Sequence, residues 1–124
     1  MSKKLLIVDD DPVTRGMMEG FFREKGYIVS LAKNGEEALR ILGEKTIDLV
    51  ISDYQMPGVD GKELVRWIYE FRPSLPVILI TGRPFCEGTE TSFLEGLHGY
   101  FPKPVDLMLL EVSITKALGD ACLG

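Results

Sequence analysis

Carboxylates follow two apolar runs of the chain, at the point where each run ends. Asp9 and Asp10 come directly after residues 4–8 (Lys-Leu-Leu-Ile-Val), and Asp53 comes after residues 49–52 (Leu-Val-Ile-Ser). Like charges this close together are costly unless a cation or a proton intervenes. Oxygen-rich clusters that leave coordination positions for water and phosphate are the usual sites for Mg²⁺ in proteins. The pattern therefore favours a metal site that contains these aspartates.

A hydroxyl group and a lysine extend this set. Thr81 ends the apolar run 77–80, and Lys103 follows the short aromatic run 100–101. Aspartate can act as a covalent nucleophile, and an aspartyl phosphate needs positive charge and hydrogen-bond donors around its phosphoryl oxygens. Lys103, Thr81 and Mg²⁺ would supply them. Asp53 by itself would be interpreted as a turn aspartate, but the whole set suits phosphoryl transfer with Asp53 as the nucleophile.

Five strands and five helices are expected to position these residues. The strands are predicted at residues 4–8, 27–31, 47–53, 76–82 and 100–101, and the helices at residues 12–25, 35–42, 61–71, 91–97 and 107–118. The alternation predicts an α/β fold in which a doubly wound, five-stranded parallel sheet has helices on both faces. Right-handed crossovers bring the carboxyl ends of all strands to one edge of the sheet. The residues expected at that edge are Asp9, Asp10, Asp53, Thr81 and Lys103.

Capping residues mark the beginnings of the helices. Asp11 precedes Pro12, and aspartate at the N-cap followed by proline is a preferred helix start, so Asp11 is assigned to capping and not to the metal site. Asn34 and Asp60 are each followed three residues later by glutamate, which is the spacing of a capping box. Asp106 is predicted to open the last helix.

The first helix combines an apolar stripe with two glycines. Gly16 and Gly20 each cost about 1 kcal/mol relative to alanine, which indicates either close packing or mobility of this helix. The stripe recurs at helical spacing and is expected to pack in the core. It consists of Met17, Met18, Phe21 and Phe22.

Composition limits the possible classes of protein. The chain has 124 residues and a net charge of −5, which fits one domain and argues against a nucleic-acid-binding surface. No apolar run approaches the roughly 20 residues of a membrane span, and the N-terminus does not resemble a signal peptide. A soluble, cytoplasmic protein is therefore expected. Cys86 and Cys122 lack the spacing of metal ligands and are treated as ordinary thiols.

The combined motifs resemble the receiver domains of two-component response regulators, and in size the chain is similar to the stand-alone chemotaxis type. The residues that carry the resemblance are Ile7-Val8-Asp9-Asp10, Ser52-Asp53-Tyr54-Gln55-Met56-Pro57-Gly58, Thr81, Tyr100 and Lys103-Pro104. The resemblance implies the flavodoxin-like receiver fold. It also implies that residues 1–124 form a single receiver domain with no effector domain.

The resemblance also implies a role for each site residue. Asp10 and Asp53 would bind Mg²⁺ directly, Asp9 would bind it through water, and the Gln55 backbone carbonyl would complete the protein ligands. Asp53 would accept a phosphoryl group from a phosphohistidine, and Lys103 would pair first with the carboxylate and then with the phosphoryl group. Thr81 and Tyr100 would act as the switch, and the Lys103–Pro104 bond would be cis.

The implied partners are a histidine kinase or phosphotransfer protein and a downstream protein target, without direct contact to nucleic acid or membrane. The chain would be a monomer or a weak dimer through the face formed by the fourth helix, fifth strand and fifth helix. It would not be a turnover enzyme, but it would catalyse its own phosphoryl transfer and a slow autodephosphorylation.

Two other functions would also use some of these residues. A haloacid-dehalogenase-type phosphatase would explain the spacing of Asp9, Asp11 and Val13, but no Gly-Asp-x-x-x-Asp motif follows Lys103 and Asp53 would have no role. An unphosphorylated pseudo-receiver that only binds proteins usually lacks a site residue, and none is lost here. Whether the chain was excised from a longer regulator or hybrid kinase is left open by the sequence.

Overall fold

A five-stranded parallel sheet forms the centre of the molecule. The computed structural model describes residues 2–56, 58–82 and 95–119. The strands are β1 (Lys4–Val8), β2 (Ile28–Ala32), β3 (Leu49–Asp53), β4 (Val77–Thr81) and β5 (Gly99–Pro102). Their order in the sheet is β2-β1-β3-β4-β5, and every neighbouring pair is parallel. The predicted doubly wound sheet is confirmed.

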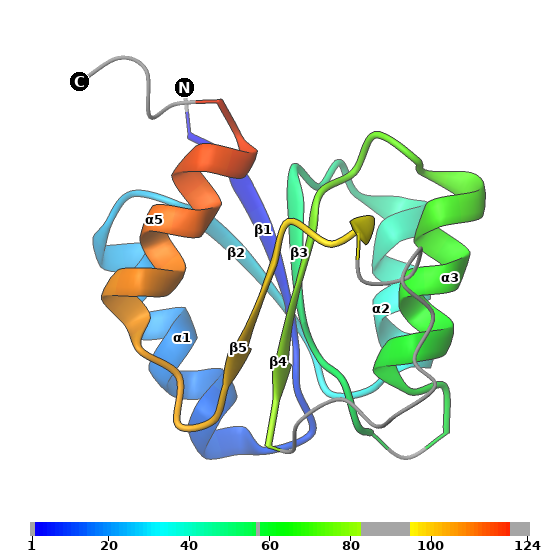
Figure 1. Ribbon diagram of the computed structural model, residues 1–124, viewed down its shortest axis with the longest axis horizontal. Coiled ribbons are helices and arrows are strands. Elements are labelled where there is room, and N and C mark those ends of the chain that lie inside the picture. The colour runs from blue at the N-terminus through cyan, green and yellow to red at the C-terminus, as the bar shows by residue number, and fades with distance from the viewer. Residues whose placement is uncertain (1, 57, 83–94, 120–124) are drawn as a thin grey trace.

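Helices cover both faces of this sheet. The helices of the described residues are α1 (Pro12–Glu24), α2 (Gly35–Glu44), α3 (Gly61–Phe71) and α5 (Leu107–Ala117). Figure 1 shows α1 and α5 on one face and α2 and α3 on the other. The helix predicted at residues 91–97 falls largely outside the described residues. No helix in the described part of the chain is long and apolar enough to span a membrane.

Each face of the sheet has its own apolar core, because side chains alternate along a strand. In β1, for example, Leu6 and Val8 pack toward α2 and α3, whereas Leu5 and Ile7 pack toward α1 and α5. All residues of β3 and β4 are buried, as expected for strands covered on both faces. The core therefore fixes the two strands that carry Asp53 and Thr81.

The predicted caps are all present. Asp11 accepts a hydrogen bond from Val13 N, and Asn34 and Asp60 accept hydrogen bonds from the amides three residues later. Asp106 accepts hydrogen bonds from the amides of the first turn of α5. These contacts fix the start of each helix relative to the strand before it.

Several predictions about local structure need correction. Strand β3 begins two residues later than predicted, β4 is one residue shorter at each end, and β5 is one residue longer at each end. Strand β2 begins and ends one residue later than predicted, because its register is set by pairing with β1. Met17 is 46% exposed, whereas Met18 is fully buried, because neighbouring residues on a helix lie about 100° apart and α1 turns only one of them toward the sheet. Close packing does not explain Gly16 and Gly20, since a Cβ atom at either position would meet nothing within 4 Å.

Candidate functional site

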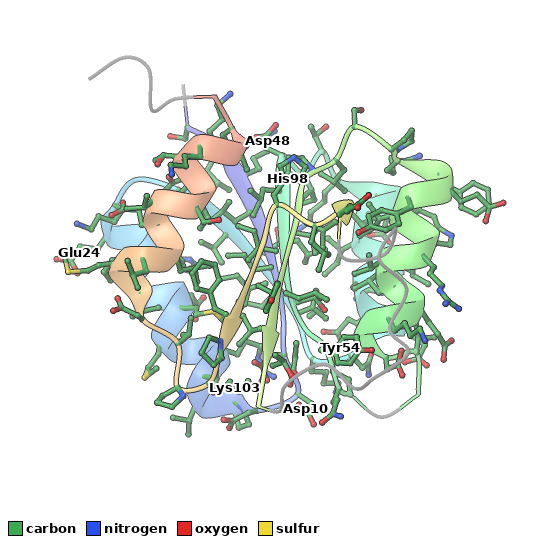
Figure 2. The ribbon with its side chains drawn as sticks, in the orientation of Figure 1. Asp10, Glu24, Asp48, Tyr54, His98 and Lys103 are labelled. Atoms are coloured by element: carbon green, nitrogen blue, oxygen red, sulfur yellow. The ribbon has the colours of Figure 1, made fainter. Side chains whose placement is uncertain are left out.

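The carboxyl ends of β1, β3, β4 and β5 form one edge of the sheet and carry the predicted site residues. Val8 is level with Ser52, and Asp53 is level with Ile80, so Asp9, Asp53 and Thr81 leave neighbouring strands side by side. Lys103 N donates a hydrogen bond to Thr81 O at 2.9 Å, which joins the segment after β5 to the same edge. Figure 2 places the labelled residues Asp10 and Lys103 together at this end of the molecule.

Lys103 is paired with two buried carboxylates. Its Nζ atom lies 3.0 Å from Asp53 Oδ2 and 3.1 Å from Asp9 Oδ2. Asp9 is fully buried and Asp53 is 5% exposed, while the side chain of Lys103 remains 23% exposed. The Lys103–Pro104 peptide bond is cis, as the resemblance implied. One ammonium group therefore faces two carboxylates that are almost completely removed from water.

Burial and charge shift the pKa of both Asp53 and Lys103. Burial is the main effect on Asp53 and raises its pKa above the ordinary value. The hydrogen bond from Lys103 lowers this pKa, and the nearby negative charge of Asp9 raises it, so that the pKa stays raised. Burial is the largest single effect and would lower the pKa of Lys103, but the hydrogen bonds to Asp53 and Asp9 and the negative charges of both together outweigh it, so that this pKa is raised. Lys103 is thus held in its charged form beside the carboxylate that would react.

The aspartates are suited to a divalent cation. One carboxylate oxygen from each of Asp9, Asp10 and Asp53 lies within 4.8 Å of the others, and oxygens bound to one Mg²⁺ lie within about 4 Å of one another. Asp9 Oδ2 is buried and accepts no hydrogen bond from the described residues, although Lys103 Nζ is near. Three carboxylates share the single ammonium group of Lys103, and like charges this close together are costly unless a further cation or a proton intervenes. The donor set therefore fits Mg²⁺.

The remaining predicted residues lie around this cluster. The backbone amide of Gln55 donates a hydrogen bond to Asp53 Oδ1 at 3.2 Å, and the side chain of Gln55 is exposed. Thr81 is 4% exposed at the end of β4. Tyr100 lies in β5 level with Leu79 and is 55% exposed, so its ring is largely in solvent. The roles of Gln55, Thr81 and Tyr100 remain predictions.

Two further residues contact the site and were not found from the sequence. Arg15 Nη1 donates a hydrogen bond to the carbonyl oxygen of Asp9 at 2.7 Å. The only available signal was that α1 begins directly after the acidic pair and that helical side chains lean toward the N-terminus. Ser52 Oγ donates a hydrogen bond to the carbonyl oxygen of Asp53 at 2.9 Å, a contact that no sequence pattern indicated.

The opposite edge of the sheet is separate from this chemistry. Figure 2 shows His98 and Asp48 at the end of the molecule away from Asp10 and Lys103. A cavity of about 410 Å³ also lies at this far edge, lined in part by Lys45, Asp48 and Arg72. The acidic cluster, and not this cavity, is the candidate site.

Comparisons with known proteins agree with this geometry. A family model described as the response regulator receiver domain matches residues 5–115. The transcriptional regulatory protein ZraR of Klebsiella oxytoca is 35% identical over 119 residues, which is 96% of this chain and 27% of that protein. The DNA-binding transcriptional regulator NtrC of Escherichia coli is 36% identical over 90% of this chain and 24% of its own length. The chain thus spans about a quarter of the length of these relatives.

Solved structures give the same result. A response regulator receiver domain protein (CheY-like) from Methanospirillum hungatei has a TM-score of 0.86 and 29% identity, with 100% of both chains covered. The response regulator TrrA from Thermotoga maritima, solved in complex with Mg²⁺-BeF, has a TM-score of 0.82 and 31% identity over 94% of this chain and 99% of that one. On the strength of its sheet order, its acidic edge and these matches, the chain belongs to the response regulator receiver domain family.

Proposed function

We propose that residues 1–124 act as one receiver domain that accepts a phosphoryl group on Asp53 in a Mg²⁺-dependent reaction. The observation that carries the proposal is the pairing of Lys103 Nζ with Asp53 Oδ2 at 3.0 Å beside the buried Asp9. A phosphatase of the haloacid dehalogenase type is not retained, because the match over residues 5–115 is to the receiver family. A pseudo-receiver is not favoured, because every predicted site residue is present.

Asp9, Asp10, Asp53 and the backbone carbonyl of Gln55 would hold the Mg²⁺ ion. When bound, the ion would neutralise charge on the phosphoryl oxygens and on the aspartates. The buried Asp9 Oδ2 atom that accepts no hydrogen bond from the described residues supports this assignment. The complex of the related TrrA protein with Mg²⁺-BeF is a further reason to propose this metal.

In the proposed reaction, a carboxylate oxygen of Asp53 attacks the phosphorus atom of a phosphohistidine on a partner protein. A new oxygen–phosphorus bond forms as the nitrogen–phosphorus bond breaks, and the nitrogen of the departing imidazole keeps the electron pair and takes up a proton. Lys103 pairs with the carboxylate before transfer and with the phosphoryl oxygens afterwards. Autodephosphorylation follows when water attacks the same phosphorus atom: the bond between phosphorus and the Asp53 oxygen breaks, inorganic phosphate leaves, and the Asp53 carboxylate is restored.

The proposed partners are a histidine kinase or phosphotransfer protein and a downstream protein target. Part of the sensor histidine kinase RcsC of Escherichia coli, 12% of its length, is 32% identical to this chain over 90% of the chain. Phosphorylation would move the Thr81 hydroxyl toward the phosphoryl group and the Tyr100 ring inward, and so alter the face that contains β5 and α5. The exposed apolar side chains Met108, Leu109 and Val112 on α5 suit this face to protein contacts, including a weak dimer.

Intact-mass spectrometry tests the proposal. The protein is incubated with acetyl phosphate and Mg²⁺, and with acetyl phosphate and EDTA, beside the variants Asp53→Asn and Asp48→Asn. Asp48 is the matched control because it lies at the far edge and because asparagine can still accept the hydrogen bond from Lys4 N. We expect one base-labile phosphoryl adduct in the wild type and in Asp48→Asn, and none in Asp53→Asn or in EDTA. Equal labelling of Asp53→Asn would assign the nucleophile to another residue.

A further inference from the structure

The loop after β3 is tied to the first turn of α2. Val59 N donates a hydrogen bond to Glu36 Oε1 at 3.0 Å, across 23 residues of sequence. Glu36 is the second residue of α2, where a negative charge is favoured by the helix dipole. The neighbouring Glu37 has a different contact, since its carboxylate accepts a hydrogen bond from the amide of Lys33, the residue before the N-cap Asn34. Glu36 is therefore the residue of this turn that reaches the loop.

Two glycines allow this close approach. A Cβ atom on Gly35 would collide with the carbonyl oxygen of Val59, and one on Gly58 would lie 2.6 Å from Glu36 Oε1. Gly58 also has a φ angle of 75°, which residues other than glycine rarely adopt. The absence of a side chain at Gly35 in the helix and at Gly58 in the loop thus lets α2 and the loop come close enough for the Glu36–Val59 hydrogen bond.

The same loop carries the site residues that follow Asp53. Gln55 N donates a hydrogen bond to Asp53 Oδ1, and Gly61 N donates one to the carbonyl oxygen of Tyr54 at 3.0 Å. A Cβ atom on Gly61 would collide with the carbonyl oxygen of Asp53. The hydrogen bond from Gly61 to Tyr54 therefore joins the two ends of the loop next to Asp53. The Glu36 side chain holds the same loop at Val59.

We propose that Glu36 is a positioning residue for the metal and phosphoryl site. By holding Val59, it restricts the segment from Val59 to Gly61, and the Gly61 amide donates a hydrogen bond to the carbonyl oxygen of Tyr54, next to Asp53. Glu36 does not itself touch the metal or the phosphoryl group. This inference rests on the proposed function, because it concerns the geometry of that same site.

Four variants separate the reach of the side chain from its charge. Glu36→Ala removes both, Glu36→Asp keeps the charge but shortens the side chain, and Glu36→Gln keeps an oxygen acceptor at full length without the charge. Glu70→Ala is the matched control, since Glu70 is an exposed acid in the last turn of α3. The measurements are the Mg²⁺ dissociation constant by calorimetry, hydrogen exchange of the Val59 amide by NMR, and the rate of labelling by acetyl phosphate.

Glu36→Ala and Glu36→Asp should weaken Mg²⁺ binding by about two- to tenfold, the effect of losing one hydrogen bond that orders the site. Both should also exchange the Val59 amide faster, and saturating Mg²⁺ should restore most of their labelling rate. Glu36→Gln and Glu70→Ala should remain close to the wild type in all three measurements.

Three results would overturn the inference. Unchanged exchange at Val59 in Glu36→Ala would mean that the contact does not hold the loop. Faster exchange with wild-type Mg²⁺ affinity would reduce Glu36 to a structural residue. Affinities that follow charge, with Glu36→Gln as weak as Glu36→Ala and Glu36→Asp normal, would assign the effect to long-range electrostatics. By contrast, a wild type that neither binds Mg²⁺ nor becomes labelled would refute the proposed function itself, and the positioning role with it.

Discussion

Replacement of Lys103 by methionine should destabilise the fold by an amount that grows with pH. The variant keeps most of the volume of the side chain but removes the ammonium group that lies 3.0 Å from Asp53 and 3.1 Å from Asp9. At an effective dielectric constant of about 20, each of these contacts corresponds to about 5 kcal/mol of Coulomb attraction. The cost of desolvating Lys103 offsets much of this attraction, and water screens the part of the side chain that is exposed. A net loss of about 3 kcal/mol is therefore expected at alkaline pH, at the lower end of the range for breaking a buried ion pair.

The pH dependence follows from the carboxylate that loses its partner. The pKa of Asp53 is already raised in the wild type, and it should rise further when Lys103 is absent. A group whose pKa is higher in the folded than in the unfolded state makes the fold less stable as pH rises through that window. The window extends to higher pH in the variant, so the difference in unfolding free energy should grow by about 1.4 kcal/mol per pH unit between the two Asp53 pKa values. Lys103 has a raised pKa as well, so its stabilising effect is fully present up to the unfolded pKa of lysine and is lost only as pH rises through the folded value.

Urea denaturation in EDTA at pH 5 and at pH 8 measures this difference. Lys116→Met is the control, because Lys116 is exposed in the last turn of α5 and the net charge changes by the same amount. The loss in Lys103→Met should be larger at pH 8 than at pH 5 and should exceed that of the control at pH 8. Equal losses at both pH values, or a loss no larger than that of Lys116→Met, would refute the assignment of Lys103 as the counter-charge of the two buried aspartates.

Three further perturbations test other parts of the structure. Asp53→Asn should raise the urea midpoint at neutral pH in EDTA, because it removes a carboxylate with a raised pKa, and the gain should vanish once acid protonates Asp53 in the wild type; a lower midpoint at neutral pH would contradict this reasoning. Gly61→Ala should lower the free energy of unfolding by more than about 2 kcal/mol, because its Cβ would collide with backbone atoms next to the site. Gly20→Ala, in the open interior of α1, should raise the free energy of unfolding by about 0.5–1 kcal/mol. Equal effects of the two variants in thermal unfolding would contradict this reasoning. Asp11→Ala should destabilise α1 at neutral pH. Hydrogen bonds from Thr14 and the adjacent backbone lower the pKa of Asp11, so the difference in stability from the wild type, measured by circular dichroism, should disappear only as pH falls through that lowered pKa.

Local features of the fold could be predicted because their causes are local. Each N-cap lies within three residues of the amide that it accepts from, so the sequence contains both partners of the interaction. The strands were recognisable as apolar runs because the sheet is covered on both faces. Where the prediction failed, as for Met17, the rotation of α1 about its own axis decided the exposure, and that rotation depends on the sheet against which it packs.

The candidate site was predictable in part for a topological reason. Right-handed crossovers bring all strand ends to one edge, so Asp9, Asp53 and Lys103 were expected together although they are separated by up to 94 residues. The expectation required no distances. By contrast, the hydrogen bonds of Arg15 to the Asp9 carbonyl and of Glu36 to Val59 N involve single charged residues on helices. Such residues are commonly solvated, and nothing in their spacing distinguishes these two.

The sequence by itself determined the order of the elements, the edge at which the acidic residues meet, and the chemistry that carboxylates, a hydroxyl and a lysine can perform together. Only the tertiary structure decided that Lys103 contacts both buried aspartates and that Asp9 keeps an oxygen without a hydrogen bond from the described residues. It also decided that the loop after β3 is held by α2. The physical reason is that residue type and period determine which face or end of an element a side chain occupies, whereas contacts of about 3 Å depend on strand register, helix rotation and the close approach of backbones, which the packing of the whole molecule sets.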